Sequence, residues 1–175
     1  LKALELTEKE NNELERASVL LNIAKVFNRL KQSDKGIEYT RQSLPLVEKL
    51  NTSVTKAELL NKITARYFYY FQDIQQPVFA DTAEYYVRQA LSVARDVQNI
   101  KEQIIALTRL NAIYESRGEY KKALDFIDQA LVKCVQGVHG RQLTTLYGDK
   151  GNLLRQMGDF KEARRFADSC LYYCE

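Results

Sequence analysis

The chain has 175 residues, of which 45% are hydrophobic and 28% are charged, and its net charge is +3 at pH 7. This length and hydrophobic content suffice for one buried core, and the mild charge, with Lys and Arg interleaved among Asp and Glu, does not demand a nucleic-acid partner. No apolar run is long enough for a membrane-spanning helix, and the first twenty residues carry too many acids for a signal peptide.

We expect an all-α protein, because only two prolines and seven glycines punctuate the chain and Val, Ile and Thr form no alternating runs. Small residues recur in pairs that are seven positions apart. These pairs are Gly36 and Ser43, Ala83 and Ala90, Ala123 and Ala130, and Ala163 and Cys170, and they are preceded by Ala24, Thr64, Asn111 and Gly151 respectively. Small side chains allow two helices to cross at close distance, so each set predicts a pair of packed helices.

The second members of these pairs are 47, 40 and 40 residues apart, which divides the chain into repeats. Residues 1–11 are expected to end a preceding repeat, since the stretch that starts at Ala3 parallels the one that starts at Ala90. Repeat one then covers residues 12–51, repeat two 52–98, repeat three 99–138 and repeat four 139–175. Repeat two contains an insertion of seven residues, about two helical turns, which can lengthen a helix and its loop without turning the buried face outward.

Signals for helix ends fall at the boundaries of these repeats. An Asn or Thr followed by Glu three residues later is a variant of the capping box that begins a helix. The predicted boxes are Asn12 with Glu15, Thr55 with Glu58, and Asn99 with Glu102. Gly118 and Gly158 are expected to end the first helices of repeats three and four in the left-handed conformation.

Pro45 falls inside the predicted second helix of repeat one, two residues after Ser43. Proline lacks the N–H that a helix interior uses and clashes with the carbonyl four residues earlier, at a cost of about 3 kcal/mol. We therefore expect this helix to be kinked or interrupted between residues 41 and 46.

The segments RGEYKKALDFIDQAL (117–131) and MGDFKEARRFADSCL (157–171) share Gly, an acid, an aromatic residue and Ala in register. Together with the large and small residues that precede them, they resemble the tetratricopeptide repeat. The resemblance implies a right-handed α-solenoid of antiparallel helix pairs, a superhelix that takes up residues 1–175 as a single array. The period of 40 exceeds the usual 34, so the helices should be longer. The apolar end DSCLYYCE suggests a fragment of a longer array.

In such arrays the first helices of successive repeats line the concave side, which binds partners. The resemblance therefore implies a binding surface on these helices, facing away from the small residues. Its predicted members are Lys25, Asn28 and Arg29 in repeat one, Asn61, Ala65, Phe68 and Tyr69 in repeat two, Thr108, Ala112 and Glu115 in repeat three, and Asp149, Asn152 and Arg155 in repeat four. Basic ends, an aromatic middle and several amides suit an extended peptide or a helix with acidic ends. Ordinary solvated helix surface is the alternative for each residue.

Residues 67–71 read Tyr-Phe-Tyr-Tyr-Phe and place an aromatic side chain on every face of a helix. Such a helix is buried or offers part of itself to a partner. Packing is favoured for Tyr67, Tyr70 and Phe71, with cover from Phe79, Tyr85 and Tyr86. For Phe68 and Tyr69 both packing and partner binding stay open.

The sequence contains no pattern that indicates catalysis or a cofactor. Cys134, Cys170 and Cys174 lack the spacing of a disulfide framework or a zinc site, and Cys170 takes the place of a small buried residue. His139 is the single histidine and occupies a loop where the other repeats have a cap, so a local structural role is expected. Nucleotide-binding and hydrolase motifs are missing from the sequence. We expect no enzyme activity, no metal and no cofactor.

These observations favour a non-catalytic scaffold that binds a protein or peptide. It is similar to the tetratricopeptide sensor regions of bacterial signalling and regulatory proteins, so we expect the sensing or docking segment of a larger protein. Self-assembly through uncapped ends is one alternative. A nucleic-acid-binding helical repeat is less favoured, because Glu115 and Asp149 interrupt the basic lining. A membrane contact is not expected from this segment, and a cytoplasmic location is favoured over an extracytoplasmic one.

Overall fold

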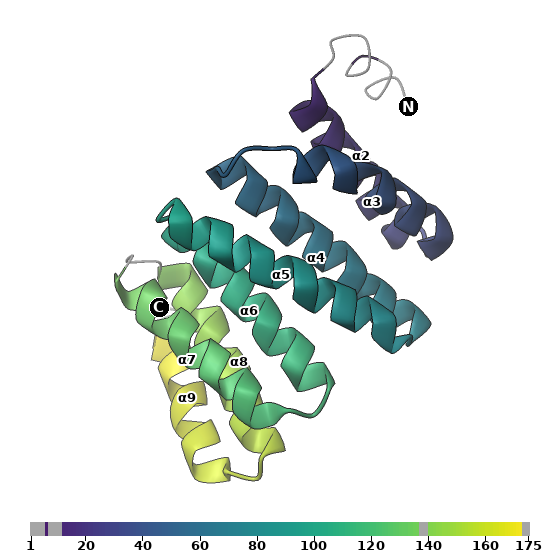
Figure 1. Ribbon diagram of the computed structural model, residues 1–175. Coiled ribbons are helices and arrows are strands. Elements are labelled where there is room, and N and C mark those ends of the chain that lie inside the picture. The colour runs from purple at the N-terminus through teal and green to yellow at the C-terminus, as the bar shows by residue number, and fades with distance from the viewer. Residues whose placement is uncertain (1–5, 7–11, 137–139, 173–175) are drawn as a thin grey trace. The chain divides into compact units, whose positions relative to one another are not determined.

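The computed structural model describes residue 6, residues 12–136 and residues 140–172, and all regular secondary structure in these ranges is helical (Figure 1). The helices are α2 (Glu13–Arg29), α3 (Ser33–Glu48), α4 (Val54–Ile74), α5 (Pro77–Asp96), α6 (Ile100–Ser116), α7 (Tyr120–Gln136), α8 (Gly140–Gln156) and α9 (Phe160–Tyr172). They form two compact units, unit 1 (Leu1–Gln98) and unit 2 (Asn99–Glu175). The boundary between the units coincides with the predicted end of repeat two.

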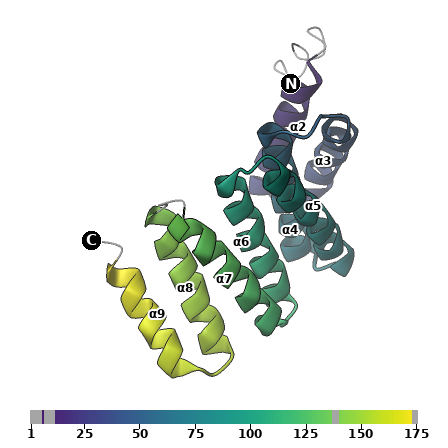
Figure 2. The same ribbon diagram turned by 60° about the vertical axis from the view of Figure 1, so that its left-hand side comes forward.

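Unit 1 consists of two antiparallel helix pairs, α2 with α3 and α4 with α5 (Figures 1 and 2). Both α2 and α3 also contact α4, so the second pair packs on the first. The buried side of α2 is made of apolar residues three or four positions apart, including Ala17, Leu20 and Ala24. This spacing explains why the segment is helical and which of its faces enters the core.

Unit 2 repeats the same arrangement with α6 paired to α7 and α8 paired to α9. Helix α7 contacts α8 and thereby joins the two pairs. The core between them contains fully buried side chains from each of the three central helices, such as Leu110, Ile127 and Leu153. Each unit therefore has its own apolar core, built from two helix pairs.

The small residues that set the period lie in the interior of the two units. All of those whose side chains the structure describes are buried: Ala24, Gly36, Ser43, Thr64, Ala83, Ala90, Asn111, Ala123, Ala130, Gly151 and Ala163. Gly36 faces α2 and α4, and Gly151 faces α9, as positions of helix contact should. The division of the whole chain into one array of four repeats stays a prediction.

Two of the three predicted helix starts are confirmed. The side chains of Asn12 and Asn99 accept hydrogen bonds from the backbone N–H groups of Glu15 (3.1 Å) and Glu102 (2.9 Å). The prediction for Thr55 is wrong, because α4 begins earlier and the hydroxyl of Ser53 caps it, accepting from the N–H of Lys56 at 3.2 Å. Ser53 has the extended backbone that a cap requires, whereas Thr55 already lies in the first turn.

The glycine-terminated helix ends are confirmed. Gly118 and Gly158 have φ values of 73° and 84°. At Gly118 the helix closes with two bonds, from the N–H of Glu119 to the carbonyl of Tyr114 and from the N–H of Gly118 to the carbonyl of Glu115, both 2.9 Å. This is the Schellman arrangement, which satisfies the last carbonyl groups of a helix.

The expected interruption at Pro45 is wrong, since α3 runs without a break from Ser33 to Glu48. Pro45 lies in the last turn of α3, so few helical bonds follow it. The carbonyl that loses its partner belongs to Arg41, which is exposed and can bind water instead. A bend of α3 at this point stays a prediction.

The insertion in repeat two lengthens both of its helices, whereas we expected it to lengthen a helix and its loop. Helix α4 has 21 residues and α5 has 20, whereas α2 and α3 have 17 and 16. Only Gln75 and Gln76 separate α4 from α5, and Gln75 is left-handed with a φ of 60°. The predictions for Ala3, His139, Tyr173 and Cys174, and for the side chains of Cys170, Leu171 and Tyr172, lie outside what the structure describes.

Candidate partner-binding surfaces

Each unit has a surface formed by the solvent-facing side chains of its first helices, which we call the first-helix face. In unit 1 it is made by α2 and α4, where exposed or half-buried residues recur every three or four positions. They are Asn22, Lys25 and Arg29 on α2, and Glu58, Lys62, Ala65, Arg66 and Tyr69 on α4. In unit 2 the corresponding helices are α6 and α8.

Lys25 and Arg29 are exposed on this face, as predicted, whereas two predicted members are not. Asn28 and Asn61 are only 2% exposed, which overturns their place on a binding surface. Asn28 fills space left by a glycine: a Cβ added to Gly36 would lie 2.2 Å from the Asn28 Oδ1 atom. The small residue on α3 thus admits the amide of Asn28 into the contact between the helices.

Tyr69 is half-buried and binds within the protein. Its hydroxyl donates a hydrogen bond of 2.6 Å to the backbone carbonyl of Asn28. This bond ties α4 to the C-terminal turn of α2. Phe68 is also half-buried and stacks on Phe71 of the same helix, with ring centroids 6.1 Å apart. Tyr69 therefore acts in packing, while part of Phe68 stays accessible.

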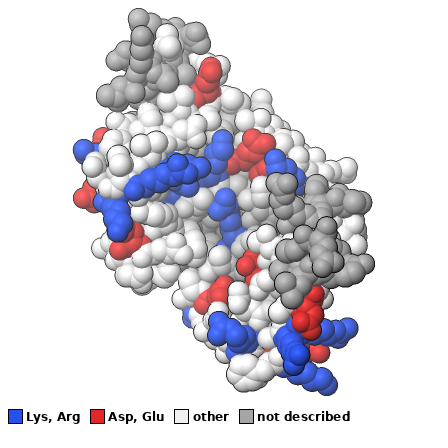
Figure 3. Space-filling model, turned by 180° about the vertical axis from the view of Figure 1, so that it is seen from behind, with Lys and Arg blue, Asp and Glu red and all other residues white. Residues whose placement is uncertain are grey.

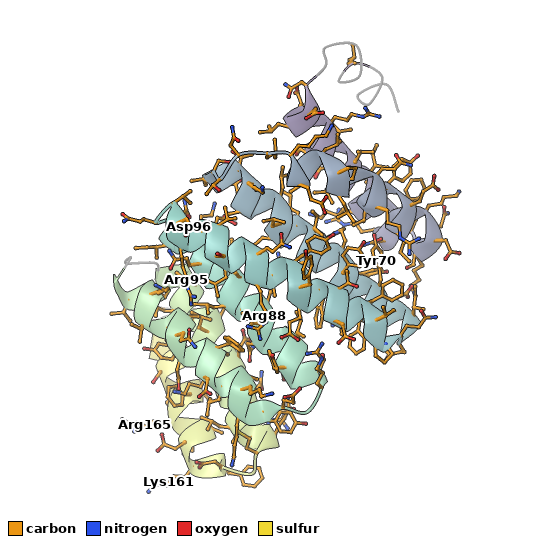
Figure 4. All side chains as sticks on the ribbon, in the orientation of Figure 1. Tyr70, Arg88, Arg95, Asp96, Lys161 and Arg165 are labelled. Carbon is orange, nitrogen blue, oxygen red and sulfur yellow. The ribbon has the colours of Figure 1, made fainter. Side chains whose placement is uncertain are left out.

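The rest of the aromatic run packs against α5. Tyr67 and Tyr70 are buried, and the ring of Tyr67 stacks on Tyr86 with centroids 5.7 Å apart. The Tyr70 hydroxyl lies 2.8 Å from the Thr40 Oγ1 atom of α3, inside unit 1 (Figure 4). Burial raises the pKa of Tyr70, an effect that the hydrogen bond to Thr40 partly offsets.

One detail of the aromatic prediction is wrong. Tyr85 was expected to cover the run, yet it is 59% exposed and meets Tyr86 only in a T-shaped contact. Phe79 and Tyr86 supply the cover instead, because they lie on the face of α5 that meets α4. Phe71 is half-buried and packs on Phe68, in agreement with the packing that was favoured for it.

The structure adds Arg66, which the sequence prediction omitted, to the first-helix face of unit 1. Arg66 is half-buried, and burial is the main cause that lowers the pKa of its guanidinium. The positive charge of Arg29 lowers this pKa further, whereas Tyr70 and Tyr69 raise it. The spacing of four between Lys62 and Arg66, repeated by Lys25 and Arg29, was the signal in the sequence.

In unit 2 the predicted residues on α6 are Thr108, Ala112 and Glu115, and all three are half-buried. The Thr108 hydroxyl donates to the carbonyl of Ile104 at 2.9 Å, so it is occupied within its own helix. Glu115 accepts a hydrogen bond of 2.6 Å from the Gln156 side chain of α8. Glu115 therefore joins the two first helices of unit 2.

On α8 the predicted residues divide between two sites. Asp149 is half-buried, and its pKa is raised first by burial and then by the negative charge of Glu115. Asn152 and Arg155 are exposed and line a groove of about 520 Å³ between α8 and α9. The other lining residues are Gly148, Gly151, Phe160, Ala163, Arg164 and Ala167. Phe160 is 69% exposed, so this groove has an apolar rim.

The described residues contain neither a candidate metal site nor a candidate membrane span. Their His, Cys, Asp and Glu side chains form no group that could hold a metal ion. Among the helices of this part of the chain, none is long and apolar enough to cross a membrane. Cys134, whose side chain is described, is buried and forms no disulfide.

Comparison with known sequences supports the repeat. Residues 144–175 match the tetratricopeptide repeat family. This match covers the predicted fourth repeat almost completely and less than half of the chain. No curated protein sequence is detectably similar to the chain.

Solved structures with the same fold cover nearly the whole chain. BtubC from P. vanneervenii is 18% identical with a TM-score of 0.77, over 93% of this chain and 64% of that one. Aspartyl phosphate phosphatase F from Bacillus subtilis is 15% identical with a TM-score of 0.76, over 93% and 41%. A signal transduction ATPase with numerous domains and a tetratricopeptide repeat sensor, from Pyrococcus horikoshii, is 16% identical with a TM-score of 0.80, over 97% and 25%.

The chain therefore spans less than two thirds of each of these three proteins. At this level of identity the similarities show the fold and nothing further. They confirm the predicted fold class, an all-α solenoid of antiparallel helix pairs of the tetratricopeptide type. This fold is generally a scaffold on whose helices partners bind.

Proposed function

We propose that the chain is a non-catalytic scaffold that binds a protein or peptide on its first-helix faces, and that it is the sensing or docking segment of a larger signalling or regulatory protein. The observation that carries the proposal is on unit 1. There Lys25 and Arg29 on α2 and Lys62 on α4 are exposed and form no ion pair within the described residues. Charged side chains that the fold does not use are available to a partner.

The placement in a larger protein rests on two comparisons. The chain spans only 25% of the Pyrococcus horikoshii protein, in which the tetratricopeptide repeats are a sensor. It spans 41% of the Bacillus subtilis phosphatase. A helical array that occupies part of a longer regulatory protein is therefore a known arrangement for this fold, and we extend it to this chain.

The experiment is to screen the chain against a peptide array and then to map one bound peptide by hydrogen–deuterium exchange. We expect protection on α2 and α4, or on α6 and α8. A matched pair of variants tests the map: Lys25→Ala should weaken binding of a peptide that protects α2, whereas Lys121→Ala, on the exposed side of α7, should not. Protection confined to α3, α5, α7 and α9 would contradict the proposal.

Self-association is a second candidate, and the exposed apolar edge of the α8–α9 groove favours it. Phe160 is 69% exposed and Met157, at the same end of this helix pair, is 39% exposed. Exposed apolar patches often mark protein contacts. Light scattering across a concentration series would reveal association, and Phe160→Ser should abolish it. A constant mass at all concentrations would exclude this candidate.

A further inference from the structure

Four cations lie together on the first-helix face of unit 1, and we call them the basic face: Lys25 and Arg29 on α2, and Lys62 and Arg66 on α4. Residues four apart lie one above the other on a helix, so each helix presents two positive charges on the same side. Helix α2 contacts α4, and the charges of Arg29 and Arg66 are close enough to affect one another. The four side chains therefore form one surface.

Nothing in the described part of the chain neutralises the basic face. None of its four members takes part in an ion pair or a side-chain hydrogen bond there. Other cations of the same unit do: Arg88 pairs with Glu84 at 2.7 Å and Lys49 with Glu13 at 3.0 Å. Figure 3 shows that Lys and Arg side chains form a band on one side of the molecule.

Arg66 gives this surface a feature that scattered surface charges lack. Its guanidinium is half-buried and keeps its positive charge at neutral pH, since arginine does not lose its proton in proteins. Burial removes part of its water, and Arg29 repels it. A carboxylate that reaches Arg66 would replace the lost water and relieve the repulsion. Charge-assisted bonds of this kind are stronger than neutral ones.

The position of this pair is fixed by the packing of the two helices. The hydroxyl of Tyr69 donates to the carbonyl of Asn28 at 2.6 Å. Asn28 is the neighbour of Arg29 on α2, and Tyr69 lies one turn after Arg66 on α4. The bond holds the C-terminal turn of α2 against α4. A site whose backbone is already ordered loses less entropy when a ligand binds.

We propose that the basic face docks an acidic segment of a partner protein, with Asp or Glu carboxylates of that segment bound by Arg29 and Arg66. The proposal rests on the proposed scaffold function and names the chemistry of the partner for one of its surfaces. A peptide suits this surface better than a nucleic acid, because Glu58 lies one turn before Lys62 on α4 and ends the positive strip. A phosphate backbone would need a longer basic track.

The test measures binding of a short fluorescein-labelled peptide in which glutamate alternates with serine and leucine, by fluorescence anisotropy with the full chain. The double variant Arg29→Gln/Arg66→Gln should weaken binding by about tenfold or more, and added salt should weaken binding to the unchanged chain. The matched control Arg88→Gln/Arg95→Gln removes the same charge from α5 of the same unit (Figure 4) and should change the affinity by less than about twofold. Circular dichroism of each variant checks that the helices are intact.

Three outcomes would overturn the inference: equal binding of a peptide with glutamine in place of glutamate, equal losses in the two double variants, or tighter binding of a DNA oligonucleotide to the basic face. A separate readout distinguishes this failure from failure of the proposed function. If neutral peptides from the array protect α2 and α4 and the acidic peptide does not, the acidic partner is wrong and the scaffold stands. If no peptide of any charge binds, both are wrong.

Discussion

Gly36 lies at the contact of three helices, where one additional methyl group has no room. A Cβ at this position would be 2.2 Å from the Asn28 Oδ1 atom and 3.1 Å from the Tyr70 hydroxyl oxygen. Asn28 and Tyr70 are both buried and belong to α2 and α4, so neither side chain can turn into solvent. The absence of a side chain on α3 is therefore what allows a polar cluster to form inside unit 1.

We predict that Gly36→Ala lowers the free energy of unfolding by about 1–2 kcal/mol, because the cost of overpacking exceeds the gain in helix propensity. Gly151→Ala is the matched control on α8. There the nearest atom to an added Cβ is the Ala163 carbonyl oxygen at 3.4 Å, an ordinary contact, so this variant should gain about 0.5–1 kcal/mol. Urea denaturation of both variants measures the difference, and equal effects would show that space at Gly36 is not limiting.

The sequence predicted the residue types at these contacts and misplaced several polar side chains. It assigned Asn28 and Asn61 to a binding surface because they lie on the helix face away from the small residues, yet both are buried. Whether an amide turns inward depends on the volume left by a neighbouring helix, which the periodicity of a single segment does not contain. Arg66 was missed because its partial burial depends on how α4 packs in the folded unit.

At the end of α2, a lysine occupies the left-handed position that glycine occupies at the end of α6. Lys31 ends α2 with the bonds found at Gly118: its N–H donates to the Asn28 carbonyl at 3.0 Å, and the next N–H reaches the Phe27 carbonyl at 2.9 Å. Its φ is 55°, a conformation that costs a residue with a Cβ about 1 kcal/mol and costs glycine nothing. A lysine thus occupies a position that favours glycine.

We predict that Lys31→Gly raises the free energy of unfolding by about 0.5–1 kcal/mol, the strain relieved less the greater entropy of an unfolded glycine. Gly118→Lys is the converse change and should lower it by about 1 kcal/mol. No atom lies within 4 Å of a Cβ built on Gly118, so the stability lost in Gly118→Lys would report the backbone conformation alone. A chemical denaturation curve for each variant gives both values. Destabilisation by Lys31→Gly would contradict this account.

The long pair α4 and α5 should make the stability of unit 1 sensitive to high pH. Burial, followed by Tyr67, Glu48 and Tyr85, raises the pKa of Tyr86 to about 12, above its value of 10.0 in an unfolded chain. Between pH 10 and about 12 the Tyr86 hydroxyl has lost its proton in the unfolded state and keeps it in the folded state. Stability is therefore fully present below pH 10 and falls as the pH rises toward about 12.

We predict that Tyr86→Phe removes part of this loss, because phenylalanine keeps the stacked ring and has no proton to release. Near pH 12 the variant should lose about 2 kcal/mol less than the unchanged chain relative to pH 7. Tyr85→Phe, at a neighbouring exposed position, is the control and should change the pH profile far less, because Tyr85 is the smallest of the causes that raise the pKa of Tyr86. Thermal unfolding followed by circular dichroism across this pH range makes the comparison. Parallel profiles for all three proteins would rule out a role for Tyr86.

At the level of helices, the period of small residues predicted the fold class and the place of the insertion. It did so because the contact between two paired helices repeats along the chain and depends on side-chain size. The division of the added residues between α4 and α5, the start of α4 and the continuity of α3 through Pro45 were not predictable in the same way. Several hydroxyl residues competed for the cap of α4, and the exposed position of Arg41 leaves its carbonyl open to solvent.

At the scale of the molecule, the first-helix faces of the two units differ in charge. Unit 1 presents the basic face, whereas the first helices of unit 2 carry Glu115 and Asp149 near one another, where each repels further negative charge. Lys150 of unit 2 is already engaged, since it pairs with Asp128 at 2.6 Å and lies over the ring of Phe166. An acidic ligand therefore meets several cations without an ion pair on the first-helix face of unit 1. On the first helices of unit 2 it meets Glu115 and Asp149, the engaged Lys150 and the exposed Arg155.

We predict that the glutamate-containing peptide slows amide exchange in α2 and α4 and leaves α6 and α8 unchanged. Hydrogen–deuterium exchange of the full chain measures both in one experiment. Lys161→Gln/Arg165→Gln is the matched control, because it removes two cations spaced four apart from α9 (Figure 4) and should not alter the protection. Protection of α6 and α8 that survives Arg29→Gln/Arg66→Gln would place the acidic ligand in unit 2. Since the basic face combines a half-buried guanidinium with cations that form no ion pair within the described residues, protection should instead disappear from α2 and α4 together when that pair is removed.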